Sequence, residues 1–190
     1  GQMGGGIAQV AAQAGYSVLL FDISEVQLKK SVELIDKLLS RNVEKAKISN
    51  DEKNAILSRI KTTANMSDLS QVDFAIEAAT ENIDLKLKIF KQLDEVTNPN
   101  IILATNTSSI SITKIAAVTK RPQNVIGMHF MNPVPVMQLV EIIKGLATSE
   151  ETLRTTLEIS AKMGKTTTLS NDIPGFIANR ILMPYINEAI

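Results

Sequence analysis

The chain contains no cysteine and no tryptophan, and aromatic residues make up only 4% of its 190 residues. Without cysteine, neither a disulfide framework nor a thiolate metal site can form, and we expect no metal centre. The absence fits a reducing compartment without requiring one. Because 44% of the residues are hydrophobic and few are aromatic, the core has to be built from aliphatic side chains.

An excess of charge is also lacking, since 20 basic and 20 acidic residues cancel. No basic block stands out, which argues against nucleic acid as a partner. No apolar run approaches the roughly 20 residues that a membrane-spanning helix needs, so we expect no membrane partner. The length suits one full domain and part of a second. The chain begins without methionine and stops inside a helical pattern, so we expect it to be a fragment.

Strand-like and helix-like segments alternate along the chain, which predicts an α/β fold with a doubly wound, mostly parallel sheet covered on both faces. Capping boxes at Ser24 and Ser49 predict the start of two helices. The helix after Ser24 has an apolar face formed by Leu28, Val32, Ile35 and Leu39. The other predicted helices are 2–14, 82–96, 111–118 and 150–163, and the predicted strands are 17–21, 60–63, 74–78, 101–105, 125–129, 139–143 and 165–169.

The chain begins with a glycine-rich segment, Gly1-Gln2-Met3-Gly4, which has the spacing of the second and third glycines of a dinucleotide fingerprint. Glycine lets the backbone approach a pyrophosphate, whose charge the helix N-terminus then holds. Asp22 follows about 20 residues later at the end of a predicted strand, where a carboxylate can bind the ribose 2′-hydroxyl and repel a 2′-phosphate. These features predict a Rossmann-type NAD site whose first strand and first glycine lie upstream. A tight glycine turn and an ordinary strand-end aspartate are the plainer alternative.

His129 is the only histidine of the chain. An imidazole titrates near neutral pH, and Glu141, beyond a proline-containing bend, could reach back to orient the ring. This pattern is typical of general acid–base catalysis. A structural histidine and an exposed strand glutamate are the plainer interpretation of the same residues.

Several segments, taken together, resemble the L-3-hydroxyacyl-CoA dehydrogenase family, which includes bacterial 3-hydroxybutyryl-CoA dehydrogenases. Besides the glycine start and Asp22, the matching segments are Glu77–Asn82, Thr105–Ser109, His129–Pro135, Glu141 and Pro174–Arg180. They cover essentially the whole chain in the order and spacing of the family. The resemblance implies an NAD-dependent oxidoreductase that interconverts (S)-3-hydroxyacyl-CoA and 3-oxoacyl-CoA.

The resemblance also implies roles for individual residues. His129 would be the general base and acid, and Glu141 would fix its tautomer. Ser108 and Asn179 would bind the substrate oxygen and help to hold the acyl-CoA, with Ser108 also near the cofactor. Further predicted cofactor contacts are Gly1, Gln2, Met3, Gly4, Asp22, Glu81, Lys86 and Asn132, and Lys45 would touch the CoA phosphates.

Local sequence alone leaves a plainer interpretation open for most of these residues. Ser108 to Ser111 could simply cap the next helix, Asn179 could lie on a helix surface, and Lys45 could belong to a solvated charged face. Glu81 could merely favour the N-terminus of the helix that follows it.

We expect residues 1–172 to form the NAD-binding domain without its first strand, and residues 173–190 to begin a helical substrate and dimerisation domain. The complete protein would be a homodimer, cytoplasmic if bacterial and otherwise mitochondrial or peroxisomal. Three rival functions remain: the dehydrogenase portion of a multifunctional fatty-acid oxidation protein, a related dehydrogenase of a non-CoA hydroxy acid or sugar acid, and a non-catalytic NAD-binding module.

Overall fold

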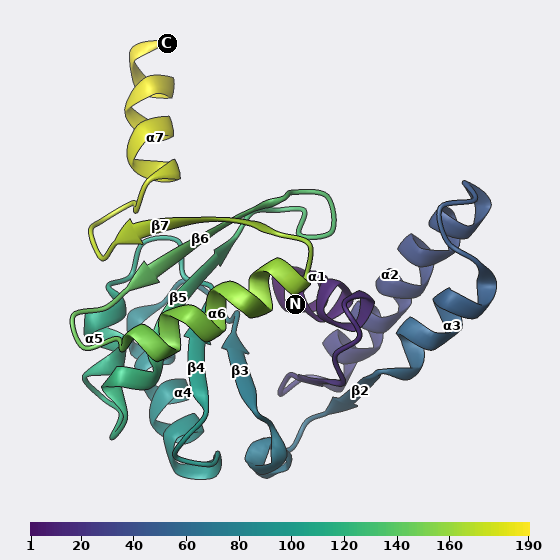
Figure 1. Cartoon of the computed structure of the whole chain (residues 1–190), viewed down its shortest axis with the longest axis horizontal. Coiled ribbons are helices and arrows are strands. Elements are labelled where there is room, and N and C mark those ends of the chain that lie inside the picture. Colours follow the sequence, from purple (N-terminus) through teal and green to yellow (C-terminus); the bar gives the residue numbers. More distant parts are fainter.

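The computed structural model describes residues 1–190, which form a sheet-centred body from which one C-terminal helix projects (Figure 1). The strands are β1 (Val18–Phe21), β2 (Ile60–Thr63), β3 (Phe74–Glu77), β4 (Ile102–Thr105), β5 (Val125–Phe130), β6 (Leu139–Lys144) and β7 (Thr166–Asn171). The α-helices are α1 (Gln2–Gln13), α2 (Glu25–Glu44), α3 (Asn50–Ser58), α4 (Ile83–Val96), α5 (Ile112–Ala116), α6 (Glu150–Lys162) and α7 (Ala178–Glu188). Two 3₁₀ helices, η1 (Met66–Gln71) and η2 (Pro122–Asn124), complete the fold. No helix has the length and apolar character needed to cross a membrane.

The strands form a parallel pair, β1-β2, and a five-stranded sheet of order β3-β4-β5-β6-β7. Every pairing is parallel except β5 with β6. The predicted α/β fold with a mostly parallel sheet is therefore confirmed. The antiparallel pair has a local cause, because the bend at residues 132–137 returns the chain directly beside β5 without a crossover helix.

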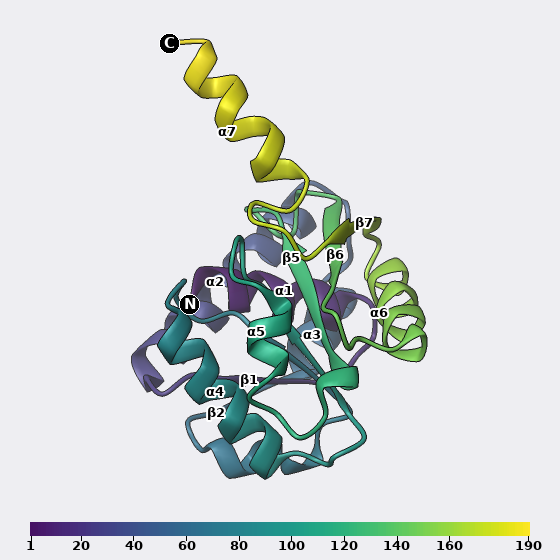
Figure 2. The ribbon, with the colours of Figure 1, turned by 90° about the vertical axis from the view of Figure 1, so that its left-hand side faces the viewer.

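Two aliphatic cores lie on opposite faces of the larger sheet, because alternate residues of a strand point to opposite sides. On β4, Ile102 and Ala104 pack into the core under α1 and α6, while Leu103 packs into the core under α4 and α5. Figure 2 shows the sheet between α6 on one side and α4 and α5 on the other. Helices therefore cover both faces, as predicted.

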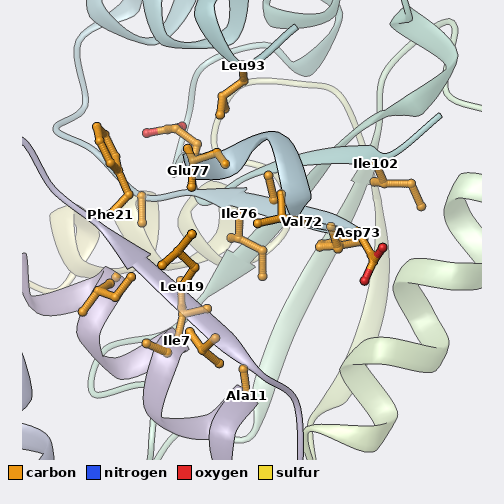
Figure 3. A pocket seen from close by; sticks show the side chains of 18 of the residues that line it. Ile7, Ala11, Leu19, Phe21, Val72, Asp73, Ile76, Glu77, Leu93 and Ile102 are labelled. Carbon is orange, nitrogen blue, oxygen red and sulfur yellow. The ribbon is translucent and has the colours of Figure 1, made fainter. Parts of the chain in front are cut away.

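The two sheets do not join, and a cavity of about 1740 Å³ separates β1 from β3. In Figure 3, Leu19 of β1, Ile76 of β3 and Ile7 of α1 line this cavity. β1 pairs only with β2 and β3 only with β4, so the two strand edges that face the cavity are unpaired. The sheet order thus has a gap between β1 and β3.

The two capping boxes predicted from sequence have different outcomes. At Ser49 both reciprocal bonds with Glu52 form. At Ser24 the side chain accepts a hydrogen bond from the Gln27 amide, but the Ser24 amide donates to Asp22 Oδ1 instead of to Gln27. The capping box predicted at Ser24 is therefore only half formed. The bond from the Ser24 amide to the Gln27 side chain is missing, because the Asp22 carboxylate accepts from that amide instead.

The apolar face predicted for α2 is also corrected at one position. Leu28, Ile35 and Leu39 are buried, whereas Val32 is only half-buried and the neighbouring Ser31 takes the inner place. A Cβ on Gly5 of α1 would lie only 3.4 Å from Ser31 Cβ. Close approach of the two helices therefore favours a small side chain there.

Candidate functional site

His129 and Glu141 occupy directly opposed positions on the antiparallel strands β5 and β6. His129 Nδ1 lies 2.7 Å from Glu141 Oε2, and the two side chains are 8% and 0% exposed. An ionised carboxylate can only accept a hydrogen bond, so Nδ1 carries the proton and Nε2 is the basic nitrogen. Nε2 has no hydrogen-bond partner in the protein. The predicted pair is thus assembled with one nitrogen left to exchange a proton.

The second carboxylate oxygen of Glu141 is held by the start of α7. The amides of Ile177 and Ala178 donate to Oε1 at 2.9 and 2.8 Å. One oxygen therefore binds His129 and the other binds the helix N-terminus, where an anion is favoured. This arrangement offsets the cost of burying a carboxylate on a covered strand.

Ser108 lies in the loop after β4, and the plain helix-cap interpretation of the 108–111 segment holds for Ser111 but not for Ser108 itself. The residue that caps α5 is Ser111, whose hydroxyl accepts from the Lys114 amide. Asn179, in the first turn of α7, donates from Nδ2 to the Ser108 carbonyl oxygen at 3.4 Å. The structure thus brings Ser108 and Asn179 together and leaves both partly exposed.

Glu81 organises the same loop. It accepts hydrogen bonds from the Thr107 hydroxyl and from the amides of Ser108 and Ser109, at 2.9 Å and 3.1 Å for the two amides. Burial raises the pKa of the Glu81 carboxyl, but these hydrogen bonds and the charge of Lys86 outweigh it, so the pKa lies below its usual value. Glu81 is therefore a stable anion that fixes the Ser108 loop.

The Lys86 side chain is buried, whereas the resemblance implies a position near the cofactor. Its side chain is 0% exposed, and its ammonium lies 2.8 Å from Glu77 Oε1 and 3.8 Å from Glu81 Oε2. Glu77 in turn accepts a hydrogen bond from the Thr105 hydroxyl. The Lys86 ammonium is thus surrounded by two carboxylates and the Ala79 carbonyl oxygen.

Sequence reasoning assigned no role to Glu77, Thr105 or Asn106, although all lie at the carboxyl ends of β3 and β4. The Asn106 side chain accepts from the Phe130 amide at 2.8 Å, which ties this edge to the strand that carries His129. These residues could have been identified from the sequence, because polar residues at the carboxyl ends of neighbouring parallel strands meet at the ligand-binding edge of the sheet.

The N-terminus of α1 is open toward a ligand. Helices α2 to α6 begin with a serine or asparagine side-chain cap, but α1 begins at Gly1 with none, so its first amides lack partners. Asp22, at the end of β1, lies 3.2 Å from the Gly1 nitrogen. Glycine backbone, free amides and a carboxylate thus fit the pyrophosphate and ribose of NAD.

One hydrogen bond links this dinucleotide end to the histidine loop. Gln2 Nε2 donates to Asn132 Oδ1 at 3.3 Å, and Asn132 follows β5 three residues after His129. A Cβ on Gly6 would lie 2.9 Å from Val134 Cβ, so α1 and the loop pack closely. The N-terminus of α1 and the His129–Glu141 pair are therefore neighbours.

Lys45 stands apart from the other predicted residues. It is exposed at the C-cap of α2, at the outer junction with α3 (Figure 1), and its side chain makes no hydrogen bond or ion pair. No group of three or more histidine, aspartate or glutamate side chains has the arrangement of a metal site.

Comparison with known proteins bears on this site. A family model described as "3-hydroxyacyl-CoA dehydrogenase, NAD binding domain" matches residues 1–173. A probable 3-hydroxybutyryl-CoA dehydrogenase of Bacillus subtilis is 50% identical over 190 residues, all of this chain and 66% of that relative. The fatty acid oxidation complex subunit alpha of Acinetobacter baylyi is 44% identical over 185 residues, 97% of this chain and 26% of that relative.

A solved structure of a similarly named protein has the same fold as this chain. The (S)-3-hydroxybutyryl-CoA dehydrogenase of Ralstonia eutropha matches with a TM-score of 0.97 at 50% identity, covering 100% of this chain and 67% of that one. The chain thus spans about two thirds of the length of the 3-hydroxybutyryl-CoA dehydrogenases that it matches. On the family match over residues 1–173, the chain belongs to the 3-hydroxyacyl-CoA dehydrogenase family and carries its NAD-binding domain.

Proposed function

We propose that the protein is an NAD-dependent oxidoreductase that interconverts (S)-3-hydroxyacyl-CoA and 3-oxoacyl-CoA thioesters. The observation that carries the proposal is the His129–Glu141 pair, which lies beside the open N-terminus of α1 through the Gln2–Asn132 contact. Relatives at 50% identity that are named 3-hydroxybutyryl-CoA dehydrogenases support the substrate class.

The proposed chemistry starts from the tautomer of His129. Nε2 takes the proton of the substrate 3-hydroxyl group while the C3 hydrogen leaves as hydride, so a carbonyl group forms. Bound NAD⁺ supplies the hydride acceptor. The imidazolium that results is stabilised by Glu141, and the reverse reduction returns the same proton. Ser108 and Asn179 hold the substrate oxygen, and Asp22 selects NAD by its ribose hydroxyl.

The test is NADH consumption by the full-length protein with acetoacetyl-CoA and with longer 3-oxoacyl-CoA substrates. Free acetoacetate and NADPH serve as controls. We expect turnover with the thioesters and NADH only. Equal turnover of free acetoacetate would favour the related non-CoA dehydrogenase, and NADH binding without turnover of any substrate would favour the non-catalytic module.

A second candidate is the dehydrogenase portion of a multifunctional fatty-acid oxidation protein. This candidate is supported by the 44% identity to the fatty acid oxidation complex subunit alpha, a longer protein of which this chain covers 26%. It predicts an enoyl-CoA hydratase region upstream in the gene, which sequencing upstream of Gly1 would find. We also propose a cytoplasmic location, because these relatives are bacterial proteins.

The proposed domain organisation is a nucleotide domain over residues 1–172 and the start of a helical domain over 173–190. The projecting α7 supports the boundary, because Ile181, Met183 and Tyr185 are exposed apolar residues that a further domain or a second subunit would cover. Light scattering of the full-length protein tests the expected homodimer.

The gap between β1 and β3 supports a further strand in the sheet. Its two unpaired strand edges and its apolar lining suit one parallel strand that would join the two sheets (Figure 3). Hydrogen exchange in the full-length protein is the check. We expect the amides of Leu19 and Ile76 to be protected there, and rapid exchange of both would contradict the proposal.

A further inference from the structure

The segment between β7 and α7, residues 172–177, contacts the start of α5 as well as His129 and Glu141 of the candidate site. Its first residue, Asp172, accepts hydrogen bonds from the amides of Ile112 and Thr113 and from the Ser111 hydroxyl. The segment is thereby fastened to α5, which follows the Ser108 loop. We call residues 172–177 the connector.

The connector makes a tight turn with two successive residues in the left-handed region, Gly175 at φ 79° and Phe176 at φ 50°. Glycine adopts this conformation without strain, whereas phenylalanine does so only when its surroundings enforce it. Phe176 is 1% exposed and belongs to the core under α4 and α5. Burial of the ring thus holds a strained backbone in place.

The buried ring also contacts the proton-transfer pair. The rings of Phe176 and His129 meet edge to face, with centroids 5.9 Å apart and planes at 61°. This packing restricts the orientation of the imidazole ring while its Nδ1 is hydrogen-bonded to Glu141.

The turn also sets the direction of the next two amides. Ile177 and Ala178 follow Phe176 directly and donate to Glu141 Oε1. A change at Phe176 would therefore move the imidazole packing and the carboxylate support together. Both partners of the pair depend on the Phe176 side chain. We therefore expect a substitution of Phe176 to slow proton transfer more than an equally destabilising substitution elsewhere in the core.

We infer that Phe176 is a positioning residue that aligns His129 and Glu141 for proton transfer. The inference deepens the proposed function and rests on it for its kinetic test. As a positioning residue, Phe176 acts on the substrate only through the His129–Glu141 pair.

The test replaces Phe176 by leucine in the full-length protein, with Phe90→Leu as the matched control. Phe90 is 0% exposed and lies in the same core, so both variants lose one buried ring. We expect similar losses of Tm. Only Phe176→Leu should lower kcat for acetoacetyl-CoA reduction, by about ten- to a hundred-fold, because a small misplacement of reacting groups costs that much. The KM for NADH should stay unchanged.

A second measurement does not depend on turnover. We expect the Nδ1 proton of His129 to give a downfield imidazole N–H signal by NMR, which can be assigned by its loss in His129→Gln. We expect the signal to persist in Phe90→Leu and to be lost by faster exchange in Phe176→Leu. Gly175→Ala should act like Phe176→Leu, because its Cβ would lie 3.1 Å from the Arg180 amide nitrogen and shift the turn.

The outcomes separate the two proposals. Equal kcat losses in Phe176→Leu and Phe90→Leu, or an N–H signal that survives in Phe176→Leu, would overturn the positioning role. A wild-type protein that reduces no 3-oxoacyl-CoA would instead refute the proposed function, and the N–H signal would still decide whether Phe176 aligns the pair.

Discussion

Replacing the Glu141 carboxylate by an amide should reverse the tautomer of His129. A glutamine side chain has one acceptor oxygen and one donor group, whereas the Glu141 carboxylate accepts from Nδ1 on one oxygen and from Ile177 and Ala178 on the other. If the glutamine oxygen faces the imidazole, its NH₂ group opposes two partly buried amide donors. Each donor left unsatisfied costs about 1–3 kcal/mol.

The other orientation avoids that cost. The glutamine oxygen then keeps both amides, and its NH₂ group donates to Nδ1 of His129. Nδ1 must therefore be unprotonated and Nε2 must carry the proton, so Nε2 cannot accept the proton of a hydroxyl substrate. We predict that Glu141→Gln folds normally and lowers kcat by about 10²–10⁴-fold, the range for loss of general acid–base catalysis or of the correct histidine tautomer.

The assay is steady-state oxidation of 3-hydroxybutyryl-CoA by the full-length variant, with NADH affinity measured by fluorescence and stability by urea unfolding. Glu158→Gln on α6 is the control, because Glu158 is exposed and makes no hydrogen bond or ion pair through its side chain. A Glu141→Gln variant with a kcat near that of the wild type would refute the tautomer argument. Loss of NADH binding together with kcat would indicate a structural defect instead.

Three further predictions concern other parts of the chain. Asp22→Ala should relax the preference for NADH over NADPH, measured by kcat/KM for both, and an unchanged ratio would count against its ribose contact. Lys86→Met should destabilise the fold by about 3–5 kcal/mol in urea unfolding, because it leaves the Glu77 carboxylate buried without its partner, and a loss below about 1 kcal/mol would contradict this. Burial raises the pKa of the Asp172 carboxyl, but hydrogen bonds from Thr113, Ile112 and Ser111 outweigh it and hold the pKa below that of an ordinary aspartate. The ionised carboxylate thus stabilises the fold above the pKa of an unfolded aspartate, and this stabilisation is lost as the pH falls through the lower pKa of the folded state, so Asp172→Asn should flatten the acid side of a plot of Tm against pH.

Much of the fold follows from local sequence. Strand and helix positions were predictable because apolar runs and helical periodicity mark them directly, and the Ser49 capping box formed as expected. The Ser24 box failed because Asp22, two residues before it, competes for the same amide. Sequence spacing within a box does not reveal such a competitor.

The contacts within the candidate site were predictable only in part. Spacing around a bend suggested that Glu141 reaches His129, and the two are cross-strand partners. The burial of Lys86 against Glu77 was not predictable, since a lysine on an amphipathic helix normally reaches solvent. The role of Phe176 also lay outside sequence reasoning, because its left-handed backbone depends on packing between segments far apart in the chain.

The central claim is that His129 exchanges the proton of a 3-hydroxyacyl substrate. The most direct test is the turnover of His129→Gln in the full-length protein, with NADH affinity measured on the same sample. We predict a loss of about 10²–10⁴-fold in kcat with unchanged NADH binding. Turnover near that of the wild type would contradict it.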